Sequence, residues 1–110
     1  MKINKELLKG STSVLILKML ENQDMYGYEI IKEMLRKSGG VFEFKEGTLY
    51  PILHAMEVDD LVSAYWEVKE ARNRKYYRIT PKGRKQLLEK KQEWNLFRNA
   101  VDGVLGEGMA

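Results

Sequence analysis

The sequence lacks several residue types on which functional sites commonly depend. It has no cysteine, which excludes disulfides and thiolate-bound metal ions, and its single histidine, His54, has no second histidine with which to share a metal. It also shows no glycine-rich phosphate loop and no pattern of paired carboxylates. We therefore expect neither an enzyme nor a protein that needs a cofactor.

Long apolar runs are missing as well. The longest, at residues 14–17, is far too short for a signal sequence or a membrane span. The 110 residues, 44 % of them hydrophobic, are enough for one small domain with a single core. The sequence thus predicts a soluble, cytoplasmic protein with no membrane partner, and dimerisation would help such a small chain to bury apolar surface.

Positive charge is concentrated in one segment. Residues 69–85 contain eight Lys or Arg and one acid, a net charge of +7, whereas the whole chain carries +3, so the remainder is acidic at −4. A basic segment on an otherwise acidic chain indicates a polyanionic partner that is met at one place. The simpler alternative is a solvated hairpin rich in Lys and Arg.

Hydrophobic periodicity and turn residues predict six elements. They are, in order, helices over about residues 5–21, 27–38 and 46–60, strands over 61–68 and 74–79 joined by a polar turn at 69–73, and a long last helix from residue 81. Thr80 is the expected cap of that last helix and Pro81 its first residue. Three helices and a two-stranded wing predict a winged helix-turn-helix, an α+β fold that is mostly α.

The third predicted helix has two distinct faces. Its buried stripe, with the spacing i, i+3, i+4 and i+7, consists of Leu49, Ile52, Leu53 and Met56. Pro51 lacks a backbone donor, so the helix should begin close before it, near Glu46 or Gly47. The opposite face, made of Gly47, Pro51, His54 and Val58, is compact and nearly uncharged. Such a face, with Gly47 and Thr48 at the helix start, suits close approach to DNA.

Four motifs occur together in this chain. They are YGYEI at residues 26–30, GTLYPILH at 47–54, DLV at 60–62 and RKYYRITPKG at 74–83. Over about residues 8–101 the chain therefore closely resembles the PadR family of bacterial transcriptional regulators, specifically its short members with a single C-terminal helix. The resemblance implies a homodimer held by that helix, which binds a palindromic DNA operator and usually represses transcription.

The predicted elements and the resemblance together indicate a division of the chain and a set of site residues. Residues 1–80 would form the DNA-binding domain, residues 81–102 the dimerisation helix and residues 103–110, rich in glycine, a flexible tail. The residues expected at DNA are Gly47, Thr48, Tyr50 and His54 on the third helix and Arg72, Arg74 and Lys75 on the wing. The apolar stripe expected in the dimer is Leu87, Trp94, Phe97 and Val101. Some short members bind planar aromatic compounds between their subunits, and Trp94 is the position to which we carry over that property.

The chain departs from the family pattern at two positions. Ala55 stands where relatives commonly have Arg or Lys, so one basic contact to DNA is missing and the operator preference should differ. Asp60 stands where glycine is usual at the end of the third helix, and aspartate tolerates the left-handed conformation needed there at a small cost in stability. Among the aromatic residues of the wing, we expect Trp66 in the core and Tyr76 and Tyr77 on opposite faces of the sheet.

Each functional assignment has a simpler alternative. Tyr50 would brace the second helix, His54 would be merely exposed, and Trp94 and Phe97 would fill a dimer core without binding a ligand. The fold also serves a different class of protein, a winged helix that docks other proteins and binds no specific DNA. A protein-docking wing would not need its high positive charge, and its binding would depend little on salt.

Overall fold

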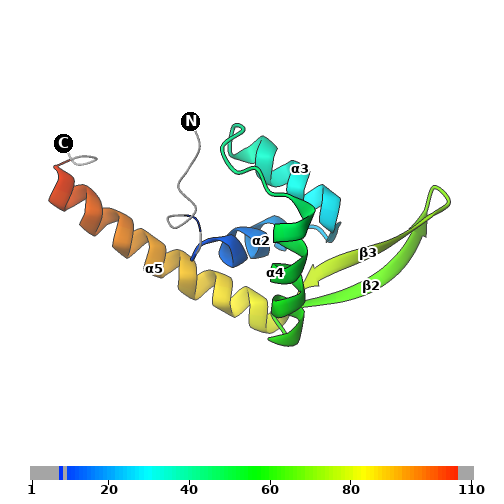
Figure 1. Cartoon of the computed structure of the whole chain (residues 1–110). Coiled ribbons are helices and arrows are strands. Elements are labelled where there is room, and N and C mark those ends of the chain that lie inside the picture. The colour runs from blue at the N-terminus through cyan, green and yellow to red at the C-terminus, as the bar shows by residue number, and fades with distance from the viewer. Residues whose placement is uncertain (1–7, 9, 107–110) are drawn as a thin grey trace.

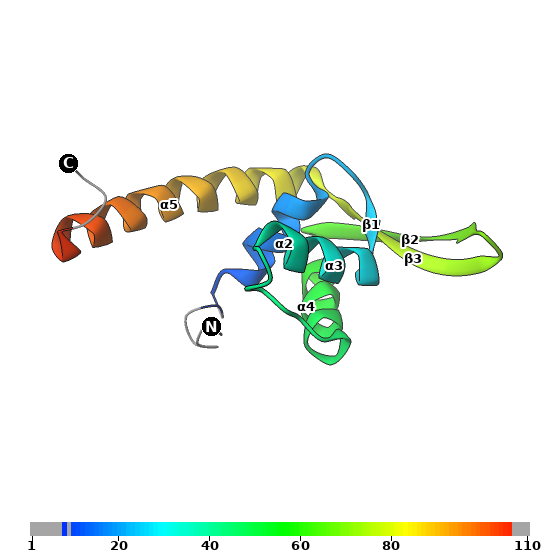
Figure 2. The same ribbon diagram turned by 90° about the horizontal axis from the view of Figure 1, so that it is seen from above.

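The computed structural model describes residue 8 and residues 10–106 (Figure 1). Its elements are α2 (Thr12–Leu20), β1 (Met25–Tyr26), α3 (Gly27–Lys37), α4 (Glu46–Val58), β2 (Val62–Lys69), β3 (Arg72–Ile79) and α5 (Pro81–Leu105). The helices α2, α3 and α4 form a body from which the β2–β3 hairpin extends in one direction and α5 in another (Figures 1 and 2). This is the predicted winged helix-turn-helix. No helix in the described part of the chain is long and apolar enough to cross a membrane.

The first helix is shorter than predicted. Gly10 and Ser11 form a turn in which the Ser11 amide donates to the Leu8 carbonyl at 2.9 Å, so α2 begins only at Thr12. Glycine and serine in succession favour a break in a helix, which the apolar pattern alone did not reveal. Of the remaining residues of the predicted helix, Leu8 is helical, and residues 5–7 and 9 lie outside the described residues.

The core lies where α2, α3, α4, the sheet and the base of α5 meet. Its largest fully buried side chains are Ile16, Leu17, Leu20, Ile30, Leu49, Leu53, Leu87 and Val62. The predicted stripe of α4 is confirmed, since Leu49, Leu53 and Met56 are buried and Ile52 packs against them. Burying each such side chain contributes about 2 kcal/mol, so the stripe holds α4 against the body and turns its other face outward.

The sheet has three antiparallel strands in the order β1, β3, β2. Strand β1 was not predicted: Met25 pairs with Tyr77, and Tyr26 pairs with Tyr76. Two residues are too few to produce an alternating pattern that the sequence alone would reveal. The pairing attaches the start of α3 directly to β3.

The hairpin of β2 and β3, residues 62–79, is the wing. Its strands stay paired up to Lys69 and Arg72, so the turn consists of Glu70 and Ala71 alone and is shorter than predicted. Both turn residues have positive φ, 51° and 62°, as the type I′ turn of a two-residue hairpin requires. Because neither is glycine, the tip carries strain of order 1 kcal/mol per residue.

The helix α4 begins where predicted and ends at Val58, slightly before the predicted end near residue 60. The helix begins at Glu46, which places Pro51 in its second turn, where only the bond to the Gly47 carbonyl is lost. At the other end Asp60 has a φ of 59°, the left-handed conformation expected there, and the Leu61 amide donates to the Met56 carbonyl at 2.9 Å. The chain thereby turns sharply from α4 into β2.

The last helix is capped as predicted but runs further. The Thr80 hydroxyl accepts from the Gly83 amide at 2.9 Å and donates to the Asp60 carbonyl at 2.6 Å, while Pro81 is the first helical residue. The helix ends at Leu105, where Gly106 adopts a positive φ of 75°. Gly103 therefore lies inside α5, and of the predicted tail only residues 107–110 fall outside the described part.

Candidate nucleic-acid interface

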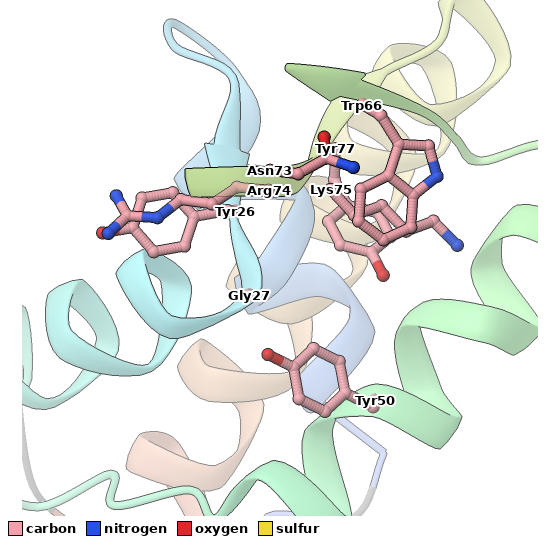
Figure 3. A pocket seen from close by; sticks show the side chains of 8 residues that line it. All are labelled: Tyr26, Gly27, Tyr50, Trp66, Asn73, Arg74, Lys75 and Tyr77. Carbon is pink, nitrogen blue, oxygen red and sulfur yellow. The ribbon is translucent and has the colours of Figure 1, made fainter. Parts of the chain in front are cut away.

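A shallow cleft separates the wing from α4. Its volume is about 440 Å³, and we call it the wing cleft; it is lined by Tyr26, Gly27, Tyr50, Trp66, Asn73, Arg74, Lys75 and Tyr77 (Figure 3). Only Tyr50 comes from α4 and only Gly27 from α3, while the others belong to β1, β2 and β3. The fold thus gathers four aromatic rings and two cationic side chains from segments that are far apart in the sequence.

The predicted residues of α4 lie together on its outer face. Gly47, Thr48, Tyr50 and His54 are all exposed, and so are Pro51, Ala55 and Val58. None of these seven side chains carries a formal charge at pH 7 with His54 neutral. The outer face of α4 is therefore open to a partner that must come close to the helix.

The position of Tyr50 is compatible with both roles that the sequence left open for it, bracing α3 and contacting DNA. Its ring lies against the backbone of Gly27, so it braces the start of α3, yet 40 % of the residue remains exposed. Burial raises the pKa of the Tyr50 phenol, and the Glu46 carboxylate adds to that effect. A tyrosine hydroxyl is protonated at neutral pH, and this shift moves it further from ionisation, so it can donate a hydrogen bond to an anion.

The three predicted cations of the wing have different surroundings. The Arg74 guanidinium lies over the Tyr26 ring, 4.3 Å from its centroid (Figure 3). Lys75 instead reaches α4, where its ammonium group is 3.0 Å from the Glu57 carboxylate and 5.6 Å from the Tyr77 ring centroid. The Glu57 carboxylate raises the pKa of Lys75 by accepting this hydrogen bond. Arg72 is exposed beside the tip of the wing. The structure therefore brings Arg74 and Lys75 to the cleft and leaves Arg72 outside it.

The face of the wing opposite to Trp66 and Lys75 carries a network that sequence reasoning missed, and Tyr26 belongs both to it and to the lining of the cleft. The Tyr65 and Tyr76 rings are stacked at 5.7 Å, and the Tyr26 ring meets Tyr76 edge-on at 5.5 Å. Asp24 accepts hydrogen bonds from the Tyr65 hydroxyl at 2.7 Å and from Arg78 at 3.1 Å. These contacts join the loop before β1 to both strands of the wing and so hold the wing at one angle to the body.

Trp66 is not a core residue, and that prediction is wrong. It pairs with Lys75 across the hairpin and is 64 % exposed, and Val68 near the tip is 67 % exposed. The wing extends beyond the body at this point, so the side of the strand that is buried near Val62 is open to solvent further out. Alternation in the sequence shows which face a residue takes and leaves open how far the body covers that face.

A second hollow lies on the other side of the body, between α2 and α5. It has a volume of about 750 Å³, and we call it the α5 groove; it is lined by Leu8, Gly10, Ser11, Val14, Leu15, Lys18, Phe42, Leu87, Lys90, Lys91, Glu93, Trp94 and Phe97. The Trp94 and Phe97 rings are 5.8 Å apart and are 51 % and 58 % exposed, and Val101 is partly exposed.

Leu87 differs from the other residues of the predicted dimer stripe. It is only 2 % exposed and packs in the core of its own chain. Leu87, Trp94 and Val101 are spaced seven residues apart and so lie on the same side of α5. The body, however, covers only the first turns of the helix, where Leu87 lies, and leaves the later turns uncovered. At most the edge of Leu87 is available to a second chain or a ligand.

The described residues contain no group of three or more His, Cys, Asp or Glu side chains placed to hold a metal ion.

A family model described as "Transcriptional regulator PadR-like family" matches residues 16–89. A transcriptional regulator of Mycobacterium tuberculosis is 32 % identical over 85 residues, which cover 77 % of each chain.

Solved structures of similar chains agree in fold. A transcriptional regulator from Clostridium thermocellum matches with a TM-score of 0.82 and 34 % identity, covering 89 % of this chain and 96 % of the other. A PadR family transcription regulator from Clostridium difficile matches with a TM-score of 0.78 and 36 % identity, covering 87 % and 99 %. At these identities and coverages the likeness extends beyond the fold to the family.

Proposed function

The chain belongs to the PadR-like family of transcriptional regulators, which are not enzymes, and from that premise we propose that it is a homodimeric repressor that binds a palindromic DNA operator. In each subunit α4 enters the major groove and the wing follows the adjacent phosphates. The two α4 helices would then meet half-sites about one helical turn, roughly 34 Å, apart.

The observation that carries this proposal is the pairing of an uncharged outer face on α4 with a basic wing across one cleft. Gly47 and Thr48 let the start of α4 come close to DNA, where the positive end of the helix dipole favours a phosphate. Tyr50 donates a hydrogen bond from the cleft side, and His54, one turn further on, faces the base edges. Position and sequence preference thus come from α4.

The wing supplies most of the electrostatic affinity. The contact with the Tyr26 ring restricts the Arg74 side chain, so less side-chain entropy is lost when it meets a phosphate. Arg72 is exposed at the tip and reaches further along the backbone. Lys75 adds positive charge to the cleft while it holds the wing to α4 through Glu57. Such contacts release counterions and make binding salt-dependent.

The homodimer rests on the outer part of α5. Trp94, Phe97, Val104 and Leu105 are all more than half exposed, and with Val101 they follow one side of the helix. A stripe of large apolar side chains on a helix that extends beyond its own body is typical of an interface with another chain. The resemblance to the short members of the family supports a second copy of this chain as the partner at that interface.

An effector that relieves repression is the finer part of the proposal. The α5 groove has the size of a small-molecule site and offers Trp94 for stacking with a planar or phenolic compound. Such a ligand would act by favouring a dimer whose two α4 helices are misplaced for the operator. The test is quenching of Trp94 fluorescence by a planar aromatic dye in a Trp66→Phe background, with the operator complex monitored in parallel. Quenching without loss of the complex would contradict this part.

The central experiment is fluorescence anisotropy on a labelled duplex from upstream of the protein's own gene, against a scrambled duplex, across a salt series. We expect tight binding that depends on sequence and falls steeply with salt, and that Tyr50→Ala weakens. Weak and equal binding to both duplexes would instead favour the winged helix as a protein-docking module. Thermal unfolding of each variant confirms that differences in binding do not reflect loss of fold.

A further inference from the structure

The first residue of α3, Gly27, lies directly against the aromatic ring of Tyr50. A Cβ added at Gly27 would be 2.7 Å from the Tyr50 hydroxyl oxygen and 2.8 Å from its Cζ atom, and closer still to Cε1. Real Cβ atoms do not come so near to another heavy atom. Gly27 is buried, and Figure 3 shows the Tyr50 ring directed toward it from α4.

The backbone at this position does not itself need glycine. Gly27 has helical geometry without a positive φ, unlike Gly39 and Gly40 at the other end of α3. In a helix glycine is less favourable than alanine by up to about 1 kcal/mol, because it loses more backbone freedom on folding. Glycine at position 27 is therefore explained by the Tyr50 ring, which occupies the space that a Cβ atom would need.

That space determines where the Tyr50 hydroxyl lies. The ring rests on the Gly27 backbone at the edge of the wing cleft, with 40 % of the residue exposed. With a methyl group at position 27 the ring has to rotate away, and the cleft beside it, about 440 Å³ in volume, offers room for the displaced ring. A side chain can make this movement without disturbing the core.

We propose that Gly27 is a positioning residue for DNA recognition, which acts by seating the Tyr50 ring so that its hydroxyl meets a phosphate. The inference rests on the proposed function, because it requires Tyr50 to contact DNA. It assigns to a buried glycine of α3 an effect on affinity that acts through α4. The YGYEI motif then matters for DNA binding even where its residues do not touch DNA.

A double-mutant cycle on operator affinity tests this, with Gly27→Ala, Tyr50→Ala and the combined variant measured by anisotropy. We expect each single change to weaken binding about tenfold, the effect of losing one charge-assisted hydrogen bond. In the Tyr50→Ala background, Gly27→Ala should change the affinity less than about twofold. The salt slope should be unaffected by Gly27→Ala, since no cation is lost.

The matched control is Gly103→Ala, a glycine inside α5 with no atom near its added Cβ, which should bind the operator like the unaltered protein. Thermal unfolding should show Gly27→Ala folded. In spectra of protein with ¹³Cε-labelled tyrosine, the signal that Tyr50→Phe removes should shift in Gly27→Ala.

Three results would overturn the inference. Additive losses in the double variant would mean that Gly27 affects binding independently of Tyr50. Unchanged binding by Gly27→Ala would mean that the position of the Tyr50 ring on Gly27 does not matter for affinity. Both leave the proposed function intact if Tyr50→Ala alone weakens binding. If Tyr50→Ala binds normally, there is no Tyr50 contact to position, and the role proposed for Tyr50 at DNA fails together with the inference. Absence of specific binding by the unaltered protein would refute the proposed function itself.

Discussion

The wing and α5 both extend from the same three-helix body, but they expose different chemistry (Figure 2). On the wing, Arg74, Lys69 and Arg78 each lie over a tyrosine ring, so cations accompany the tyrosines of one face, while Trp66 on the other face is exposed. On α5, Trp94 and Phe97 are open to solvent with no cation over them. The difference teaches that exposure alone does not identify a partner: the wing is complementary to a polyanion, whereas α5 is complementary to another apolar surface.

The largest effect should come from placing a charge on the α5 stripe. Trp94→Glu replaces an aromatic residue of the proposed interface with a carboxylate that would be buried without a partner, so we expect the dimer dissociation constant to rise at least about 100-fold. Sedimentation velocity over a concentration series measures this. Leu88→Glu, on another side of the same helix and 59 % exposed, is the control and should leave the dimer unchanged. A dimer that survives Trp94→Glu would contradict the proposed interface.

A change on the wing should affect DNA binding and leave the dimer intact. Arg74→Ala removes one phosphate contact, so operator affinity should fall about tenfold and the salt slope should decrease by about one. Arg98→Ala, on α5 and away from the wing, removes the same charge and should alter the slope little. Equal slopes for the two variants would mean that the net charge matters and the position of Arg74 does not.

The joint between the two regions should matter to stability. Thr80→Val keeps the shape of the side chain but loses the hydroxyl that bonds both Gly83 and Asp60, so the free energy of unfolding should fall by about 1 kcal/mol. Urea denaturation at fixed protein concentration measures it. Thr80→Ser retains the hydroxyl and should recover most of the loss. If Thr80→Val unfolds like the unaltered protein, the hydroxyl bonds do not stabilise the start of α5.

The smallest effect should come from the pair of Lys75 and Glu57. Both side chains are about one-third exposed, so Lys75→Met should cost only about 0.5 kcal/mol of stability. The pKa of Lys75 is raised above its usual 10.5, so the contribution of the pair is fully present at pH 7 and is lost as the pH rises through that raised value. Denaturation of the variant and the unaltered protein at pH 7 and pH 11 should show the difference shrinking. A difference that persists at pH 11 would point to lost packing on Tyr77.

Local features of this protein follow from its sequence alone. The stripe on α4 determined which face is buried, the Thr80 and Pro81 pair determined where α5 begins, and Asp60 marked the turn after α4. Each depends on a helical period or on hydrogen bonds between residues close in the chain, so a short window of sequence contains the whole cause.

Contacts between distant segments were decided only by the tertiary structure. Four features depend on how far one element covers another. They are the pairing of β1 with β3, the exposure of Trp66, the burial of Leu87 and the packing of the Tyr50 ring on Gly27. The amino acids at these positions are compatible with either outcome, because a tryptophan or a leucine gains from any apolar neighbour, its own chain or a second one. The sequence by itself therefore determined the main helices, the hairpin and which of their faces are apolar, and the packing of those elements decided which apolar and aromatic groups stayed free to meet a partner.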